Sequence, residues 1–388
     1  MDFVVKYLYS PFTVPKIPDT MSGDFSLLIK PASADCNLRC RYCFYLDKGA
    51  LFGGGSHRMD CGTLETLTRA YLALPLRQHC FAWQGGEPTL MGLDFFREAA
   101  RLQIRHKRHG ANIANALQTN ATLIDDSWAE FLHAHKMLAG VSIDGPAAIH
   151  DASRRTIGGA ATHADVLRGY HALRRHGVDT NVLSLVSAAN AAHPLDIYRH
   201  LRDLGAAFHQ YIECVEFDAR GELLPFSLRA GQWGEFLCRI FDEWFAHDTR
   251  RVSVRLFDSI LSRLLAGAPT QCAMNGDCRN YLVIEHNGDV FPCDFHVRAE
   301  LRLGNIHRDP FPSLLATPAY ADFGARKNPH SAVCSACRYL PLCMGDCPKN
   351  RAPSVGRSHL CEGWQLFYSH TIARFEELAA RLQRLQRR

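Results

Sequence analysis

Three cysteines near the N-terminus have a spacing that suits metal chemistry. Cys36, Cys40 and Cys43 form a C-x3-C-x2-C pattern, with aromatic residues between and after them. Three thiolates can hold three irons of a four-iron, four-sulfur cube and leave the fourth iron open to another ligand. The same spacing also fits a zinc site or scattered core cysteines. The pattern alone therefore leaves all three interpretations open.

A larger group of cysteines lies in the last third of the chain. Four of them form a C-x2-C-x5-C-x3-C string, three precede it and one follows it, and eight thiolates can fully ligate two four-iron clusters. Zinc bound by four thiolates uses similar spacings, so zinc is the alternative for the string itself. The remaining Cys61, Cys80, Cys214 and Cys238 are expected to be ordinary buried thiols. The group comprises Cys272, Cys278, Cys293, Cys334, Cys337, Cys343, Cys347 and Cys361.

The composition is that of an ordinary globular protein with reduced thiols. The chain has 388 residues, 47% of them hydrophobic and 21% charged, and contains no apolar run long enough to span a bilayer. Prolines interrupt residues 1–20, so we interpret this segment as an arm and not as a signal peptide, and we expect a cytoplasmic location. Because the cytosol keeps thiols reduced, 15 cysteines indicate metal or cluster ligation instead of disulfides.

The formal net charge of +5 does not predict a nucleic-acid partner. The arginines are dispersed, which is typical of a solvated surface. An oxidised four-iron cluster carries about −2 with four thiolates and about −1 with three, so two of the former and one of the latter bring the protein near neutrality. We expect neither nucleic acid nor membrane as a partner.

Short apolar runs alternate with amphipathic stretches through the first half of the chain. Helical spacing is found at residues 93–106, 126–136, 163–176 and 194–204. Six strand–helix units imply a parallel sheet with right-handed crossovers, and six are too few for a closed eight-fold barrel. We therefore predict an α/β fold with a partial (β/α)6, TIM-like barrel. Its strands are predicted at residues 25–29, 80–83, 116–118, 139–143, 180–186 and 208–212.

Motifs with polar residues and glycines follow the predicted strands at their C-terminal ends, where barrels of this kind carry their chemistry. The cysteine loop follows the first strand, Gln-Gly-Gly-Glu-Pro (84–88) the second, Thr119-Asn120 the third and Asp144-Gly-Pro the fourth. In the second motif, two glycines let the backbone approach a ligand closely, and Glu87 offers a carboxylate to an ammonium group. All these motifs therefore lie at the end of the barrel where a site is expected.

The rest of the chain is predicted to form helices and a small second domain. Aromatic residues between positions 233 and 244 have the spacing of a buried helix face. Asn287-Gly288 between two β-rich runs predicts a hairpin with a type I′ turn, and the residues after Cys361 predict one helix. The predicted division is an N-terminal arm (1–24), a barrel (25–230), a helical linker (231–270), a cysteine-rich domain (271–361) and a C-terminal helix (362–388).

These motifs together resemble a known group of enzymes. The C-x3-C-x2-C loop followed by Gly-Gly-Glu-Pro resembles the radical S-adenosylmethionine superfamily, and the later cysteine string resembles a SPASM domain. A closer resemblance, to the anaerobic sulfatase-maturating enzymes, extends over residues 26–367. It rests on motifs found in the same order, among them Gln84-Gly-Gly-Glu-Pro-Thr, Ser142-Ile-Asp-Gly-Pro, Cys293-Asp-Phe and Cys347-Pro-Lys.

The resemblance implies S-adenosylmethionine and three 4Fe–4S clusters as cofactors. S-adenosylmethionine would fill the open iron of the cluster held by Cys36, Cys40 and Cys43, and its cleavage would give a 5′-deoxyadenosyl radical. Two auxiliary clusters would lie in the SPASM domain. The inner one would be held by Cys272, Cys278, Cys293 and Cys347, and the outer one by Cys334, Cys337, Cys343 and Cys361.

The implied activity is oxidation of a Cys or Ser in a sulfatase polypeptide to Cα-formylglycine. The radical would abstract a Cβ hydrogen, Asp294 would accept the thiol or hydroxyl proton, and the auxiliary clusters would accept the electron. A hairpin-end cap is the alternative role of Asp294. A reductant such as flavodoxin or ferredoxin and a monomeric state complete the expectation. Two other classes stay open: a SPASM enzyme that crosslinks, epimerises or forms thioethers in a ribosomal precursor peptide, and a non-catalytic zinc-binding protein.

Further residues are assigned by resemblance and position. A substrate pocket is predicted for Tyr45 and Gln84. Arg154 suits the cofactor carboxylate because of its guanidinium fork, and an ordinary surface arginine is the alternative. The chain departs from the family at Ala121, where Gly is common, and in the shorter, more basic segment 350–360, which could change the polypeptide that docks. Contacts to S-adenosylmethionine are predicted for Tyr42, Gln84, Gly85, Gly86, Glu87, Ser142 and Arg154.

Overall fold

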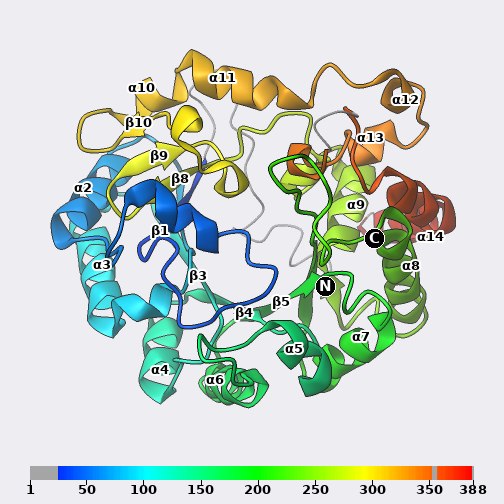
Figure 1. Ribbon diagram of the computed structural model, residues 1–388, viewed down its shortest axis with the longest axis horizontal. Helices are drawn as coiled ribbons and strands as arrows, with labels where there is room; N and C mark the ends of the chain where they lie inside the picture. Colours follow the sequence, from blue (N-terminus) through cyan, green and yellow to red (C-terminus); the bar gives the residue numbers. More distant parts are fainter. Residues whose placement is uncertain (1–24, 352–355, 387–388) are drawn as a thin grey trace.

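The computed structural model describes residues 25–351 and 356–386, and its core is a ten-stranded sheet (Figure 1). The strand order is β10-β9-β8-β1-β2-β3-β4-β5-β6-β7. All neighbouring strands from β8 and β1 to β6 and β7 in this order pair in parallel. The pairs β8–β9 and β9–β10 are antiparallel. The predicted arm (1–24) lies outside the described residues. The strands are β1 (Ser26–Lys30), β2 (Gln78–Trp83), β3 (Asn112–Thr119), β4 (Leu138–Ser142), β5 (Thr180–Val186), β6 (Phe208–Glu213), β7 (Ser253–Val254), β8 (Tyr281–Glu285), β9 (Asp289–Phe291) and β10 (Gly304–Asn305).

The six predicted strands correspond to β1 through β6, and the predicted partial barrel is confirmed. Helices lie outside the sheet in Figure 1, as crossover connections between parallel strands require. In α3, for example, Phe96, Ala99 and Leu102 recur at helical spacing and form its buried face. The helices are α2 (Cys61–Leu72), α3 (Leu93–His106), α4 (Asp126–Ala134), α5 (Ala147–Ser153), α6 (His163–Arg175), α7 (Pro194–Asp203), α8 (Ala230–His247), α9 (Arg255–Ala266), α10 (Phe311–Leu315), α11 (Pro318–Gly324), α12 (Ala332–Ser335), α13 (Leu340–Cys343) and α14 (Cys361–Gln386).

The cysteine-rich region continues the sheet of the barrel. β8 pairs in parallel with β1 over its whole length, from Tyr281 opposite Ser26 to Glu285 opposite Lys30. At the other edge, the two residues of β7 extend the sheet beyond β6. The sheet is therefore continuous across the predicted boundary at residue 271. This pairing brings the hairpin of the second region next to the end of β1, where the cysteine loop begins.

The turn of that hairpin differs from the predicted type I′ turn. The strand register leaves three residues, 286–288, between β8 and β9. The positive φ angle falls on Gly288 (85°) and not on Asn287, and the Gly288 N–H donates to the carbonyl of Glu285. This pattern is that of a type I turn followed by a left-handed glycine, the usual three-residue hairpin. The predicted hairpin is confirmed. The predicted two-residue type I′ turn is wrong, because the loop has three residues.

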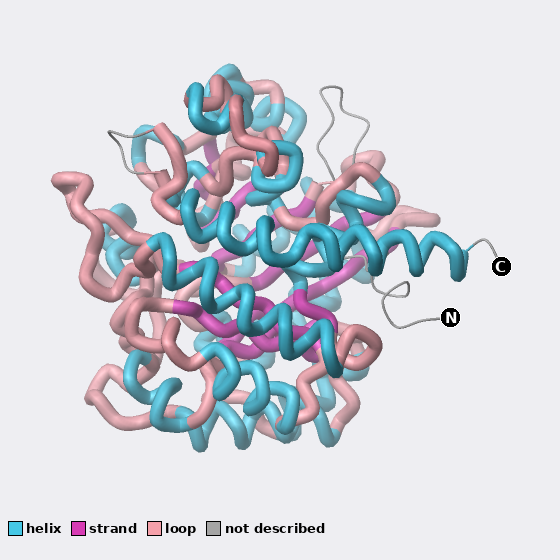
Figure 2. Tube along the Cα trace, turned by 90° about the vertical axis from the view of Figure 1, so that its right-hand side faces the viewer, coloured by secondary structure: helices cyan, strands magenta, loops and turns pink. Residues whose placement is uncertain are grey.

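The C-terminal helix α14 packs against α8 and α9 (Figure 2). A pair of glycines allows the close contact with α8, because a Cβ atom at Gly234 would lie 2.5 Å from the carbonyl oxygen of Gly363. The aromatic face predicted for residues 233–244 is buried in this interface and in the core. None of the helices in the described residues has the combined length and apolar character needed to cross a bilayer.

Candidate active site

The cysteine loop between β1 and residue 45 is held in place by the loop that follows β2. The Gly86 N–H donates to the carbonyl of Ser33 at 2.6 Å. A Cβ atom at position 86 would lie 2.0 Å from the carbonyl oxygen of Asp35, so only glycine fits there. On its other side the loop bonds to the end of α5, through the Arg39 N–H and the Arg155 carbonyl. The two glycines of Gln-Gly-Gly-Glu-Pro thus let two loop backbones touch.

The three thiols of this loop lie close enough to interact. The Cys36 sulfur accepts hydrogen bonds from the backbone N–H of Leu38 (3.3 Å) and from the Asn120 amide (3.8 Å). Burial first, and then the charges of Glu87, Cys40 and Cys43, raise the pKa of the Cys36 thiol to about 12. Burial also raises the pKa of Cys40, and a cationic iron centre on this loop would oppose both shifts by favouring the thiolates.

The Glu87 carboxylate braces the loops that surround the cysteines. Oε1 accepts hydrogen bonds from the backbone N–H of Thr89 (3.0 Å), from its hydroxyl (2.7 Å) and from the hydroxyl of Thr119 (2.8 Å). Oε2 accepts the backbone N–H of Asn120 at 2.7 Å. These bonds fill most of the acceptor capacity of a carboxylate, so Glu87 fixes the ends of β2 and β3 relative to each other. Its predicted contact with an ammonium group stays a prediction.

Tyr42, Asp144 and Arg154 form a buried group on the other side of the loop. The Tyr42 hydroxyl donates to Asp144, and Arg154 Nε lies 3.1 Å from Asp144 Oδ2. The Arg154 guanidinium carbon also lies 5.6 Å from the centre of the Tyr42 ring. Arg154 is only 9% exposed, so the alternative of an ordinary surface arginine is wrong. The Asp144 N–H donates to Nδ1 of His150 at 3.3 Å, and burial lowers the pKa of His150 to about 3.

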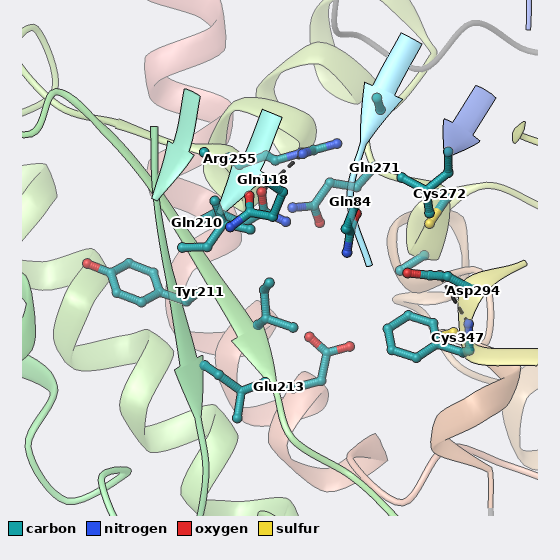
Figure 3. A pocket seen from close by; sticks show the side chains of 18 of the residues that line it. Gln84, Gln118, Gln210, Tyr211, Glu213, Arg255, Gln271, Cys272, Asp294 and Cys347 are labelled. Carbon is teal, nitrogen blue, oxygen red and sulfur yellow. Dashed lines mark hydrogen bonds between the residues drawn. The ribbon is translucent and has the colours of Figure 1, made fainter. Parts of the chain in front are cut away.

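A cavity of about 410 Å³ lies between the barrel strands and the cysteine-rich region (Figure 3). Figure 3 shows Asp294 and Cys347 on one side of this cavity, and Gln118 and Gln210 on the other. Two of the predicted contact residues, Gln84 and Tyr42, also line it. Its walls combine apolar strand residues with these polar side chains, as is typical of small-molecule and peptide sites.

Asp294, the predicted base, is buried and lines the cavity. Its Oδ1 accepts hydrogen bonds from the Tyr281 hydroxyl (2.9 Å) and from the backbone N–H of Phe295 (3.1 Å). Its Oδ2 lies 3.8 Å from Nζ of Lys30, whose side chain is 1% exposed. Burial lowers the pKa of Lys30, while the charges of Asp294 and Glu285 oppose that shift. The pairing of β8 with β1 creates this ion pair.

Six of the predicted contact and pocket residues do not line the cavity: Gly85, Gly86, Glu87 and Arg154, described above, and Tyr45 and Ser142. The Tyr45 hydroxyl donates to the buried Glu285, and its ring lies 4.2 Å from Nζ of Lys30. Ser142 accepts a hydrogen bond from the Gln118 amide at 3.2 Å. Tyr45 thus contacts Lys30, which pairs with Asp294, and Ser142 orients an amide that itself lines the cavity.

Electrostatic influences link cysteines within each of the two predicted groups of the second region, and their assignment to two clusters stays a prediction. Burial raises the pKa of the Cys347 thiol, and the charges of Cys272 and Cys293 raise it further. Burial, together with the charge of Cys272, raises the pKa of Cys278 to about 11. In the outer group, burial raises the pKa of Cys361, with further increases from Cys334 and Cys337; Cys361 acts in turn on Cys343. Each group therefore shares one local environment.

The number of these thiols suits iron–sulfur clusters. In the part of the chain that the structure describes, no three or more His, Cys, Asp or Glu side chains are arranged to hold one ion. The described cysteines are free thiols, and sets of three, four and four match one open and two closed 4Fe–4S clusters.

Of the four remaining cysteines, two are buried and two are exposed or partly exposed. Cys80 and Cys214 are buried, as predicted. Cys61 is exposed and Cys238 is partly exposed, so the prediction of buried thiols was wrong for these two. Cys61 is the first residue of α2, directly after the helix cap Asp60, where a side chain faces solvent.

Two polar residues that line the cavity, Glu213 and Arg255, and Lys30, which contacts the lining residue Asp294, were missed from the sequence. Lys30 and Glu213 are the last residues of β1 and β6, so the rule that chemistry lies at strand ends could have found them. Glu213 lines the cavity, and burial raises the pKa of its carboxyl. Arg255 also lines the cavity and donates to Gln210 at 3.0 Å. Arg255 is the first residue of α9, and nothing in the sequence around it indicated a place at the cavity.

The geometry defines a radical S-adenosylmethionine enzyme with a SPASM domain, and family comparisons agree. Residues 31–201 match the family described as Radical SAM superfamily, and residues 276–338 match the SPASM family, described as an iron–sulfur cluster-binding domain. Proteins of these families use S-adenosylmethionine with a 4Fe–4S cluster and bind auxiliary clusters in the SPASM domain.

Curated relatives narrow the class. The chain is 34% identical to a serine-type anaerobic sulfatase-maturating enzyme of Bacteroides thetaiotaomicron, over 93% of this chain and 91% of the relative. It is 36% identical to a cysteine-type enzyme of Clostridium perfringens, over 91% and 98% respectively. The chain belongs to the family of anaerobic sulfatase-maturating enzymes.

Solved structures agree with this family. The structure described as native anSMEcpe with bound AdoMet and Cp18Cys peptide matches with a TM-score of 0.85 and 34% identity, over 92% of this chain and 99% of that one. Streptococcus suis SuiB bound to S-adenosylmethionine matches with a TM-score of 0.63 over 87% of this chain and 77% of that one, but at 15% identity, so this likeness concerns the fold alone.

Proposed function

We propose that this protein oxidises a Cys or Ser side chain of a sulfatase polypeptide to Cα-formylglycine. The observation that carries the proposal is the cavity that Asp294 shares with Cys272 and Cys347 of the inner thiol group and with Gln84 and Gln118 of the barrel. The proposed base and two thiols of the proposed electron acceptor thus line one cavity, and Tyr42 extends this cavity to the cysteine loop that is the proposed radical source. Membership of the sulfatase-maturating family supplies the substrate class.

The cysteines have three roles in this proposal. Cys36, Cys40 and Cys43 hold the cluster that binds S-adenosylmethionine, and the inner and outer groups of four hold the auxiliary clusters. When bound, these groups supply the 5′-deoxyadenosyl radical that removes the Cβ hydrogen and the acceptor for the remaining electron. Backbone atoms of Gly85 and Gly86, together with Tyr42, Glu87, Ser142 and Arg154, position the cofactor.

Asp294 accepts the proton of the target thiol or hydroxyl. Its Oδ1 already accepts two hydrogen bonds, so Oδ2 is the atom that takes the proton. Nζ of Lys30 lies 3.8 Å from this oxygen and helps to fix the position of the carboxylate. Gln84 and Gln118 face the same cavity and offer amide groups that can bind the polypeptide backbone.

Mass spectrometry of peptides tests the proposal. The reconstituted protein is incubated anaerobically with S-adenosylmethionine, a reductant such as flavodoxin or ferredoxin, and three peptides that differ only in Cys, Ser or Ala at the target position. Formation of an aldehyde from Cys or Ser, and not from Ala, is expected together with 5′-deoxyadenosine. A crosslinked, epimerised or thioether product would contradict formylglycine formation. Size-exclusion chromatography of the same sample tests the proposed monomer.

A further inference from the structure

Lys327 is a buried lysine at the end of a short 3-10 helix, Ala325–Lys327, which follows α11. Its side chain is 1% exposed. Nζ lies 2.6 Å from the carbonyl oxygens of Ala273 and Asn275 and 3.4 Å from that of Cys272. The three carbonyls belong to one turn, which carries the first cysteine of the inner group. Lys327 therefore fastens the Cys272 turn from a segment more than fifty residues away.

Among the described residues, the direct partners of Lys327 Nζ are three backbone carbonyls and no carboxylate. An ammonium group has three N–H donors, and three carbonyls accept them here. Within residues 25–351 and 356–386, no carboxylate oxygen lies within 4.0 Å of Nζ. Asp277 lies farther away and pairs with Arg279, and the charge of Lys327 contributes to lowering the pKa of Asp277. Buried charges are normally paired, because moving an unpaired ion out of water is costly. The balancing negative charge must come from another group.

The turn to which Lys327 bonds carries a cysteine of the inner group. Nζ lies 3.4 Å from the carbonyl oxygen of Cys272 itself. A four-thiolate cluster on the inner group would place a charge of about −2 next to this buried side chain. The assigned inner cluster is therefore a negative group that fits Lys327.

The segment that carries Lys327 contacts both cysteine groups through its backbone as well. Arg351 donates to the carbonyls of Lys327 (3.4 Å) and Gly345 (3.2 Å), and Gly345 lies between Cys343 and Cys347 in the sequence. The Cys278 N–H donates to the carbonyl of Gly324 at the end of α11. The segment that carries Lys327 is therefore bonded to the Cys278 loop and, through Arg351, linked to the turn between Cys343 and Cys347.

We propose that Lys327 compensates the negative charge of the auxiliary clusters and thereby raises their reduction potential. This inference rests on the cluster ligands assigned under the proposed function. Each four-thiolate cluster that takes up one electron changes its charge from about −2 to about −3, and a fixed buried cation stabilises the more negative state. The residue acts through the clusters and their loops, and is a positioning residue instead of a catalytic one.

Potentiometric titration of the reconstituted protein tests this role. Lys327→Met keeps the length of the side chain and removes the charge, whereas Lys327→Arg keeps the charge. Arg326→Met is the matched control, because it removes one positive charge from the exposed neighbouring position. Iron content is measured for each variant, and the electron paramagnetic resonance signal of the auxiliary clusters is followed against potential, with dithionite as the electron donor.

A shift of at least one auxiliary cluster to a more negative potential in Lys327→Met, at unchanged iron content, is the expected result. Lys327→Arg and Arg326→Met should titrate as the unmodified protein does. An unchanged potential in Lys327→Met would overturn the inference. Loss of iron in Lys327→Met that Lys327→Arg restores, with normal potentials in the clusters that remain, would also overturn it in favour of a purely structural role. Absence of auxiliary iron from the unmodified protein would instead contradict the ligand assignment itself.

Discussion

Two regions of the molecule place thiols beside a buried cation, and the charge of that cation is balanced differently in each. In the barrel, Arg154 lies 3.1 Å from Asp144, which neutralises it. In the cysteine-rich region, the hydrogen bonds of Lys327 within the described residues go to backbone carbonyls. Both cations act on a nearby thiol, Arg154 on Cys40 and Lys327 on Cys272. We infer that the regions differ in the direct partner of the cation, which is a carboxylate in the barrel and a backbone turn in the cysteine-rich region.

The two regions also assemble their thiols in different ways. Cys36, Cys40 and Cys43 lie on one loop that backbone hydrogen bonds clamp on two sides. The inner group combines Cys272 and Cys278 with cysteines that follow the hairpin and α13, so four segments must be brought together. The first arrangement is local in sequence and the second depends on tertiary contacts. Variants of each region should therefore fail in different ways.

The largest expected effect follows from removing the three thiols of the barrel loop. Replacing Cys36, Cys40 and Cys43 together by Ala should remove about a third of the roughly 12 irons expected for three four-iron clusters. Cleavage of S-adenosylmethionine should be abolished, because no other thiols lie on that loop. Iron analysis and chromatography of 5′-deoxyadenosine measure both effects, and continued cleavage would refute the assignment of this loop.

The matched variant removes three thiols from the outer group. Replacing Cys334, Cys337 and Cys343 by Ala should also remove about a third of the iron. Cleavage of S-adenosylmethionine should persist while product formation fails, because the barrel loop is left intact. Loss of cleavage in this variant would show that the two regions are not independent.

Asp294→Asn keeps the shape of the side chain and removes the proposed base. Product formation should fall by about 10²–10⁴-fold, the usual contribution of a positioned general base. Iron content and cleavage of S-adenosylmethionine should be unchanged, and deuterium from a β-labelled peptide should still enter 5′-deoxyadenosine. Full product yield at normal iron content would exclude Asp294 as the base, and loss of inner-cluster iron would point to a structural role.

A stability measurement tests the claim that the Arg154 charge is neutralised by Asp144. Arg154→Leu leaves the buried Asp144 without its cation, and the free energy of unfolding should fall by about 3–5 kcal/mol. Arg155→Leu is the control, since the Arg155 side chain donates to an exposed carbonyl and its loss should cost less than about 0.5 kcal/mol. Urea unfolding of both variants compares them, and equal midpoints would contradict a buried ion pair at Arg154.

The smallest expected effect concerns pH. Burial lowers the pKa of His150 to about 3, so the folded protein leaves it neutral where the unfolded chain binds a proton. Its contribution to stability is therefore complete above the usual pKa of 6.5 and is lost as the pH falls toward 3. Between pH 7 and 5.5 the unmodified protein should lose about 1 kcal/mol more than His150→Asn. The exposed His171→Asn should keep the full pH dependence, and a pH profile unchanged in His150→Asn would disprove the assignment.

Much of the fold was predictable because its signals are local. Each of the six barrel strands is a short apolar run followed by an amphipathic helix, and the predicted ranges match β1 through β6. The hairpin was also predicted, but its turn was not, since the choice between a two- and a three-residue loop depends on how β8 and β9 pair. The exposure of Cys61 was missed for a different reason. A cysteine at the start of a helix carries no signal in the sequence that tells whether its side chain is buried.

By itself, the sequence determined the thiol spacing, the barrel units and the motifs at the strand ends, because these depend on neighbours a few residues apart. Only the tertiary structure decided which cations meet which anions. Lys30 reaches Asp294 because β8 pairs with β1, and Lys327 reaches the Cys272 turn because α11 folds back over it. These charged side chains meet through contacts between segments that are distant along the chain, in places that exclude water. Such contacts cannot be predicted from short-range patterns in the sequence.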